Sequence, residues 1–179
     1  MTDHSELNWE QRLEELRRSS RISIDAQGRW SHEAVRFEHS RIVAALDTGL
    51  DWSMTDGSTH EPLKDCFDQW SGEATVRLGE QWCYVTSDVT PFLVTKIHAD
   101  HQLRSLVAIL NNHERWPLRL IALRDDVLFT RLAPHRLARF SVDAQSQCAQ
   151  WLTQGQDDIF ALEWGAHRWV IQDSLSTST

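Results

Sequence analysis

The stretch from Gln81 to Arg131 decides the fold of this chain: QWCYVTSDVTPFLVTKIHADHQLRSLVAILNNHERWPLRLIALRDDVLFTR. Three runs rich in β-branched and aliphatic residues lie at 81–97, 103–110 and 117–123, and short polar breaks separate them. Apolar runs of this length bounded by turn residues are typical of strands. The run at 103–110 is the most apolar, so we expect it to be a central strand covered on both faces. The stretch therefore predicts the main sheet of a β-rich α+β protein.

The composition is that of a globular protein. The chain has 179 residues, of which 41% are hydrophobic and 25% are charged, enough for one domain or two small ones. Its 18 basic and 26 acidic residues give a net charge of −8. A negative field repels phosphate backbones, so we expect no nucleic-acid polymer as partner, although a small basic pocket for one nucleotide remains compatible with this charge.

Cysteine use and hydropathy bear on the location of the protein. The three cysteines, Cys66, Cys83 and Cys148, are widely spaced and form no CxxC pattern, which indicates free thiols in a reducing compartment. No run approaches the roughly 18 apolar residues of a membrane span, and the first residues lack the basic and apolar regions of a signal peptide. We expect a cytoplasmic protein without membrane contact; the oligomeric state is left open.

Helical and strand periodicities extend the prediction to the rest of the chain. Three helices are expected: one at 5–18 with one apolar face (Trp9, Leu13, Leu16), one capped by Ser40, and one from Pro134 to about Leu152, within which Ser141 marks a break or a fresh N-cap. Hairpins are expected at 22–37, 74–86, 118–131 and 159–171. Single strands are expected at 92–97 and 103–110, with a loop at 98–101. The segment at 51–72 is irregular and is expected to be an ordered loop or a short helix.

These elements predict four parts: an N-terminal docking helix at 1–20, a first α+β sub-domain at 21–97, a second at 98–173, and a polar tail at 174–179. In three hairpins a turn glycine is followed within four residues by a tryptophan, at Gly28–Trp30, Gly79–Trp82 and Gly165–Trp169. Either a hairpin-plus-helix unit is duplicated, or tryptophan simply favours hairpins; the sequence leaves both readings open.

Candidate catalytic and metal-binding residues are few. His98 and His101 flank Asp100, but no third ligand is specified nearby, so we predict a solvated loop and no metal site. His32 beside Glu33 is a candidate general base, and Asp88 is the acid that would complete a hydrolase-type site. Because no nucleophile motif accompanies them, no catalytic residue is assigned, and Asp88 also suits a turn-capping role.

Candidate ligand-binding residues are mostly arginines. No Gly-rich phosphate loop occurs, so the sequence identifies no cofactor, and a nucleotide would have to be held by arginine forks and an aromatic face. The candidates are Arg29, Arg119, Arg124 and Arg131 for charge, and Trp30 or Trp116 for stacking. Solvated arginines on strand faces are the alternative interpretation. Asn112 suits a turn, and like Asp88 it could also face a cleft between two sub-domains.

The order of short motifs resembles a bacterial family, the domain-of-unknown-function family numbered 1285. The motifs are Ile-Asp-x-x-Gly-Arg-Trp-x-His-Glu at 24–33, Val-x-Ser-Asp-Val-x-Pro-Phe at 85–92, Asn112 followed by Pro117-Leu118-Arg119, and Arg124 through Arg131, and the resemblance covers about Arg21 to Ile171. Ala34, Ser87 and Asn111 stand where the family pattern has a glycine, an acid and a threonine.

The resemblance implies two related α+β sub-domains, the second similar to a pleckstrin-homology-like fold. It also implies a nucleotide-like ligand at the cleft between them and a role in signalling, without an established reaction. The matching positions are Arg29, Trp30, His32, Asp88, Phe92, Asn112, Arg119, Arg124 and Arg131.

Three functions are therefore expected from the sequence. The first is a non-enzymatic ligand-binding or signalling module, which we favour. The second is a hydrolase-type enzyme using His32 and Asp88. The third is a protein–protein adaptor that presents an exposed patch among the nine tryptophans.

Overall fold

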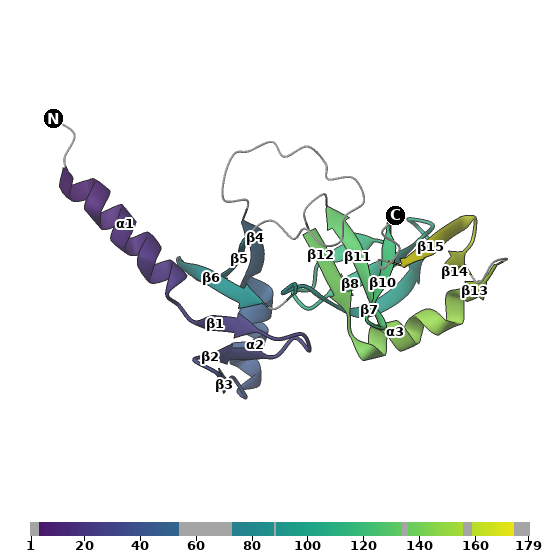
Figure 1. The fold of residues 1–179 in the computed structure, drawn as a ribbon, viewed down its shortest axis with the longest axis horizontal. Coiled ribbons are helices and arrows are strands. Elements are labelled where there is room, and N and C mark those ends of the chain that lie inside the picture. The colour runs from purple at the N-terminus through teal and green to yellow at the C-terminus, as the bar shows by residue number, and fades with distance from the viewer. Residues whose placement is uncertain (1–3, 54–72, 88, 134–135, 156–158, 174–179) are drawn as a thin grey trace, which may run out of the picture. The chain divides into compact units, whose positions relative to one another are not determined.

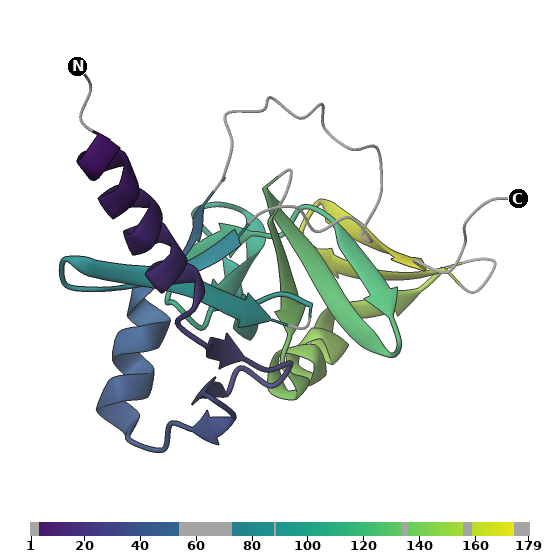
Figure 2. The ribbon, with the colours of Figure 1, turned by 60° about the vertical axis from the view of Figure 1, so that its left-hand side comes forward.

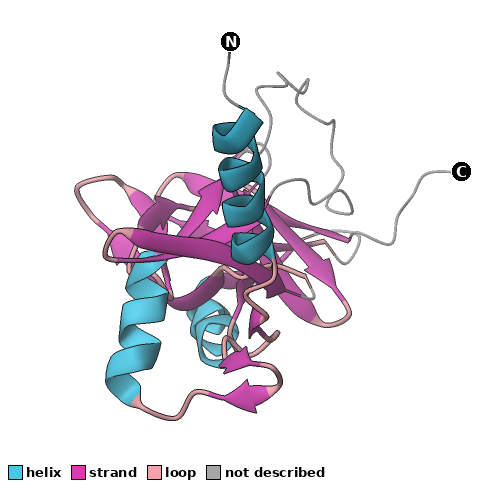
Figure 3. Cartoon of the chain, turned by 90° about the vertical axis from the view of Figure 1, so that its left-hand side faces the viewer, coloured by secondary structure: helices cyan, strands magenta, loops and turns pink. Residues whose placement is uncertain are grey.

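The computed structural model describes residues 4–53, 73–87, 89–133, 136–155 and 159–173, which form three α-helices, one 3₁₀ turn and two mixed sheets of six and nine strands (Figure 1). Strands predominate over helices, as the magenta ribbons of Figure 3 show. The predicted α+β class is confirmed. The predictions for Asp88, for most of the irregular segment at 51–72 and for the tail at 174–179 lie outside the described residues.

The described residues fall into two compact units, the first before Phe92 and the second from Phe92 onward. No helix among them is long and apolar enough to cross a membrane. The first unit contains α1 (His4–Arg18), β1 (Ile22–Ile24), β2 (Trp30–His32), β3 (Val35–Arg36), α2 (Ser40–Gly49), β4 (Leu50–Ser53), β5 (Glu73–Leu78) and β6 (Gln81–Ser87). Its strand order is β3-β2-β1-β6-β5-β4, with β1 and β6 parallel.

The core of the first unit lies between the sheet and α2, which packs against β5 (Figure 2). Trp30 on β2 lies opposite Ile24 on β1, and both side chains are 1% exposed. Leu46 of α2 is equally buried. The Trp30 indole Nε1 donates a hydrogen bond to Asp47 Oδ1 at 2.8 Å, which ties the sheet to the helix.

The helix α1 docks on β6 through polar and aromatic contacts, which differs from the apolar face predicted for it. Tyr84 donates its hydroxyl hydrogen to Glu14 Oε1 at 2.6 Å, and the guanidinium of Arg17 lies 4.0 Å from the ring centroid of Trp82. Trp9 and Leu16 are each 63% exposed. The 3.6-residue period identified the helix correctly, but the cation–π contacts and the Glu14 hydrogen bond hold it on its sheet.

The second unit contains β7 (Leu93–Asp100), β8 (Ser105–Leu110), β9 (Arg115–Pro117), β10 (Ile121–Arg124), β11 (Val127–Ala133), β12 (Arg136–Phe140), α3 (Val142–Cys148), the 3₁₀ turn η1 (Ala149–Trp151), β13 (Leu152–Gln154), β14 (Phe160–Trp164) and β15 (His167–Asp173). The strand order is β13-β14-β15-β10-β11-β12-β7-β8-β9, with parallel pairs at β15/β10 and β12/β7. On β8 the consecutive residues Leu106, Val107 and Ala108 are all buried, so this strand is covered on both faces as predicted.

Two predicted elements in this unit are wrong. The expected helix from Pro134 to Leu152 is instead the strand β12 followed by the short helix α3. Leu137 and Ala138 are adjacent and both buried, which suits a strand paired on both edges, here with β11 and β7. The expected loop at 98–101 is also strand as far as Asp100, because β7 stays paired with β8 to its end.

Three glycine turns join β1 to β2, β5 to β6 and β14 to β15, and Gly28, Gly79 and Gly165 have φ of 77°, 65° and 62°. These left-handed conformations explain the choice of glycine at each turn. In both units three strands, a helix and three more strands follow one another, and the order β3-β2-β1-β6-β5-β4 recurs as β12-β11-β10-β15-β14-β13 within the larger sheet. The first and last strands of each set are parallel neighbours. The described elements therefore favour the duplicated unit over the alternative that tryptophan simply favours hairpins.

Ser141 begins α3 as its N-cap, one of the two roles expected from the sequence. Its Oγ accepts a hydrogen bond from the backbone N–H of Ala144 at 3.1 Å. We expect Ser141→Ala to lower the free energy of unfolding by about 0.5–2 kcal/mol, because a first-turn N–H loses its partner. Urea unfolding followed by circular dichroism measures this loss.

Ser146 provides the control for that measurement. It lies inside the same helix, is exposed, and donates its hydroxyl to the carbonyl of Val142 at 2.9 Å. Ser146→Ala should leave stability nearly unchanged, since alanine favours helix interiors. Equal losses in the two variants would contradict the capping role of Ser141.

Candidate functional site

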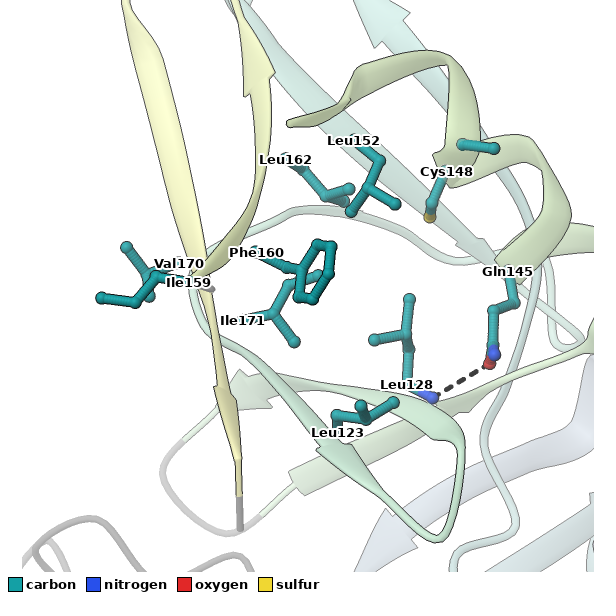
Figure 4. Close-up of a pocket in the computed structure, with 11 residues that line it drawn as sticks. Leu123, Leu128, Gln145, Cys148, Leu152, Ile159, Phe160, Leu162, Val170 and Ile171 are labelled. Atoms are coloured by element: carbon teal, nitrogen blue, oxygen red, sulfur yellow. Dashed lines mark hydrogen bonds between the residues drawn. The ribbon is translucent and has the colours of Figure 1, made fainter. Parts of the chain in front are cut away.

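A cavity of about 660 Å³ lies within the second unit, between α3 and one face of its sheet (Figure 4). Its volume is within the range of roughly 300–1,000 Å³ that small-molecule sites occupy. The strands β10, β11, β13, β14 and β15, the residue before β14, and the helical segments α3 and η1 contribute to the lining. The lining residues are Leu123, Leu128, Gln145, Cys148, Ala149, Leu152, Ile159, Phe160, Leu162, Val170 and Ile171.

Strand register brings the apolar side chains of the sheet to one face. Leu123 lies directly opposite Leu128, and Leu152 lies directly opposite Leu162. Cross-strand partners share a face of the sheet, and residues two apart on a strand do so as well. Phe160 therefore joins Leu162 on that face, and Figure 4 shows its ring among the side chains that line the space.

The cavity exists because the helical cover is short. The helix α3 has seven residues and packs on β7 and β12, while η1 contacts β14. A helix about 10 Å across covers only about two strands spaced roughly 4.8 Å apart. The apolar face over β15 and β10 therefore has no helix on it within the described residues.

Three lining residues are also exposed, so the cavity has an open mouth. Leu152, Ile159 and Phe160 are between 42% and 45% exposed. Val170 is also exposed, but it is paired with Ala161 and lies on the opposite face of the sheet from Leu162. Large apolar side chains gathered at one opening are costly to leave in water, and such patches commonly mark binding sites.

The polar groups in the lining are already hydrogen-bonded. Gln145 Oε1 accepts from the backbone N–H of Leu128 at 3.0 Å, and its Nε2 donates to the carbonyl of Asp126 at 2.8 Å. The Cys148 thiol donates to the carbonyl of Ala144 at 3.3 Å, and burial raises its pKa to about 12. A thiol with this pKa stays protonated near neutral pH and is a poor nucleophile.

None of the described residues that line the cavity carries a formal charge at neutral pH. Within the described residues, no group of three or more His, Cys, Asp or Glu side chains is placed to hold a metal. His98 lies instead 3.0 Å from the Nη2 of Arg115, which also donates to Asp100 at 3.2 Å.

The predicted ligand residues of the first unit have separate environments. The Nε of Arg29 donates to Asp25 Oδ2 at 2.6 Å in the turn between β1 and β2. Burial raises the pKa of Asp25, but hydrogen bonds from Arg29 and Gln27 and the charge of Arg29 outweigh it, so the net pKa is lowered. Trp30 is a core residue and His32 is exposed at the end of β2.

The predicted residues of the second unit do not line the cavity. Asn112 is buried in the turn after β8, where its Nδ2 donates to Glu114 Oε1 at 2.9 Å. Arg119 and Arg124 are exposed, and Arg131 is half-buried on β11. The Nε of Arg124 lies 3.7 Å from Asp125 Oδ2.

An arginine that the sequence analysis did not select has a largely buried side chain paired with a carboxylate. Arg136 has a side chain 11% exposed, lies 4.1 Å from the ring centroid of Phe92 and 5.4 Å from that of Trp116, and donates from Nη2 to Glu114 Oε1 at 2.9 Å. Glu114 also accepts from Trp116 Nε1 at 2.6 Å and from Asn112. We call these residues the Glu114 cluster, and its polar groups mostly satisfy one another.

The tryptophans are distributed between core and surface. Trp30 and Trp169 are buried, whereas Trp82, Trp116, Trp151 and Trp164 are half-buried and Trp9 is exposed. Trp169 donates from Nε1 to the carbonyl of Leu118 at 2.8 Å. The adaptor hypothesis stays a prediction, and among the seven tryptophans whose exposure the structure describes, Trp9 is the exposed one on which it would depend.

The sequence analysis predicts the cavity-lining residues only as parts of strands and of a helix. Apolar residues alternate with others on the last hairpin, and this pattern predicts a covered face. The sequence signal that could have indicated an uncovered face is the break at Ser141, which limits the following helix to a few residues.

Two solved structures are similar to this chain. A DUF1285 family protein from Silicibacter pomeroyi DSS-3 is 11% identical, with a TM-score of 0.56 over 85% of this chain and 79% of the other. A DUF1285 family protein from Shewanella baltica OS155 is also 11% identical, with a TM-score of 0.48 over 74% and 92%. No protein-family model and no curated protein matches the chain. The resemblance drawn from the sequence motifs is thus confirmed at the level of the fold.

Proposed function

We propose that this protein binds a small molecule without transforming it, and that the cavity of the second unit is the binding site. The observation that carries the proposal is a cavity of about 660 Å³ whose lining is largely apolar and whose mouth exposes three large apolar side chains. Concave apolar sites of this size are the usual form of small-molecule sites in proteins. A role in signalling, as the family resemblance implies, would depend on this binding.

The chemistry of the lining supports binding over catalysis. Catalysis needs a group that transfers protons, attacks a substrate or stabilises developing charge near the reacting atoms. In the described lining, the Cys148 thiol is held protonated by its raised pKa, and the amide of Gln145 is tied to β11 and its turn. The hydrolase alternative with His32 and Asp88, and the nucleotide-like ligand at a cleft between the two halves, stay predictions. We also propose a cytoplasmic location, consistent with the free thiols of Cys83 and Cys148.

The test is a ligand screen by thermal unfolding of the full chain, with a matched pair of variants. We expect at least one small apolar compound to raise the melting temperature, since a ligand at 100 times its Kd stabilises the native state by about 2.7 kcal/mol. Leu152→Trp, at the mouth, should remove this shift by filling the opening, because Leu152 is 45% exposed and the larger ring can be accommodated there.

Leu103→Trp is the control, because Leu103 is 57% exposed in the same unit and does not line the cavity. It should keep the full shift. A panel of nucleotides run beside the apolar compounds tests the competing ligand class. If no compound of either class stabilises the chain, the binding function is wrong.

A further inference from the structure

The chemistry of the cavity restricts the ligand further, on the premise that the proposed binding function holds. We infer that the cavity takes a linear hydrocarbon chain of the acyl or alkyl class, with the polar end of that molecule left in water at the mouth. Three independent features of the lining lead to this class: its aliphatic character, the engagement of its polar atoms, and the position of the open mouth.

The lining is mainly aliphatic. Four leucines, two isoleucines and one valine contribute to it, and Phe160 is the single aromatic ring among the described lining residues. Planar aromatic ligands gain specific affinity from stacking on rings and from cationic side chains over their faces. Flexible saturated chains gain affinity in proportion to the apolar area they remove from water, which a leucine-rich wall provides.

A charged ligand group would have no partner inside. The described lining contains no arginine, lysine, histidine, aspartate or glutamate, and the amide of Gln145 already bonds to Leu128 and Asp126. Moving a phosphate or carboxylate out of water without a compensating charge is strongly unfavourable. The phosphates of a nucleotide therefore do not fit the interior, whereas a carboxylate or hydroxyl head can stay hydrated at the mouth.

The exposed residues show where such a head would lie. Leu152, Ile159 and Phe160 are lining residues that also reach solvent, so a chain that enters between them keeps its first atoms at the surface. The interior beyond them is closed by Leu162, which is fully buried on β14, and by Cys148 of α3 (Figure 4). The Cys148 thiol is protonated and donates a hydrogen bond to the carbonyl of Ala144. The hydrocarbon chain of the ligand is therefore held without a covalent bond to this cysteine.

The experiment uses the full chain and a series of straight-chain alcohols, namely hexanol, octanol, decanol and dodecanol, with dodecanoate and adenosine monophosphate beside them. Dissociation constants come from thermal-shift titrations and calorimetry. We expect each added methylene to tighten binding by about four-fold until the cavity is full, which follows from the transfer free energy of a buried methylene. Dodecanoate should bind comparably to dodecanol, and adenosine monophosphate should not bind in the cavity.

Phe160→Asp and Leu103→Asp form the matched pair for the location of the chain. An added carboxylate at Phe160 should weaken dodecanol binding at least ten-fold, since the chain would have to desolvate it, whereas Leu103→Asp should not change the affinity. If Phe160→Asp does not fold, Leu152→Trp supplies the same comparison with Leu103→Trp without adding charge.

The outcomes separate the two proposals. One outcome is that an aromatic compound or adenosine monophosphate binds, that Leu152→Trp removes this binding, and that the alcohols do not bind. This result would retain the binding function and overturn the assignment of a hydrocarbon chain as the ligand. Alcohol binding without dependence on chain length, or unaffected by Phe160→Asp and by Leu152→Trp, would also overturn it. A complete absence of binding by any compound would remove the proposed function itself.

Discussion

Trp30→Ala is expected to lower the free energy of unfolding of the first unit by about 3–5 kcal/mol, the usual cost of truncating a large buried aromatic side chain. Trp30 is 1% exposed, so its removal would leave a void among Ile24, Leu46 and the other core residues of the sheet and α2. The indole hydrogen bond to Asp47 at 2.8 Å would be lost as well. Urea unfolding of the full chain, followed by circular dichroism, measures the loss.

Two further variants separate the contributions of Trp30. Trp30→Phe keeps an aromatic ring but removes the N–H that Asp47 accepts, so we expect an intermediate loss of about 1.5–3 kcal/mol, as for hydrogen bonds to charged groups. Trp9→Ala is the control, because Trp9 is 63% exposed and its loss should be within about 0.5 kcal/mol. Equal stability of Trp30→Ala and Trp9→Ala would show that the indole of Trp30 is not a core element.

Glu114→Ala is expected to cost about 2–3 kcal/mol in the second unit, the penalty for leaving buried polar groups unsatisfied. The carboxylate accepts hydrogen bonds from Asn112, Trp116 and Arg136, and the side chain of Arg136 is only 11% exposed. The Nε of Arg136 is buried and has no hydrogen-bond partner among the described residues, so removing Glu114 would leave this guanidinium still less compensated. The measurement is again urea unfolding, here at neutral pH.

Glu163→Ala is the matched control for the Glu114 cluster. Glu163 forms an ion pair with Arg168 at 3.1 Å, and the two side chains are 45% and 50% exposed. Solvent screens such a pair, so its removal should cost at most about 1 kcal/mol. If Glu163→Ala proved as costly as Glu114→Ala, the burial of Arg136 would not be the cause of the effect.

The contribution of Glu114 should also depend on pH. Burial acts to raise the pKa of Glu114, but the hydrogen bonds from Arg136 and Trp116 and the charge of Arg136 outweigh it and hold the pKa below its ordinary value of 4.5. The stability gained from a lowered carboxyl pKa is present above the unfolded-state pKa and is lost as the pH falls toward the folded-state pKa. The difference between wild type and Glu114→Gln should therefore shrink below pH 4.5.

The sequence predicted most elements because their signals are local. The turn glycines Gly79 and Gly165 identified two hairpins through their need for a positive φ, and Asp125-Asp126 identified the turn between β10 and β11. The pattern failed where a segment was compatible with two structures. Leu137 and Phe140 fit a helical period, yet pairing of β12 with β11 and β7 decided for a strand.

The candidate site was not predictable in the same way. Charge and motif directed attention to Arg29, Arg119 and Arg124, which lie on exposed positions. A cavity forms where the packed elements leave a space unfilled, and no residue type in the sequence indicates such a space. The sequence alone does not distinguish Leu152 and Phe160 from ordinary core residues. The length and position of α3 decide that they line a cavity.

The sequence by itself determined the α+β class, the strand-rich stretch from Gln81 to Arg131 and the turns that divide it, because periodicity and turn chemistry act over a few residues. Only the tertiary structure decided which strands are neighbours, that Arg136 is buried beside the carboxylate of Glu114, and that one apolar face of the nine-stranded sheet stays open. These outcomes depend on contacts between residues far apart in the chain, and such contacts are settled only when the elements pack together.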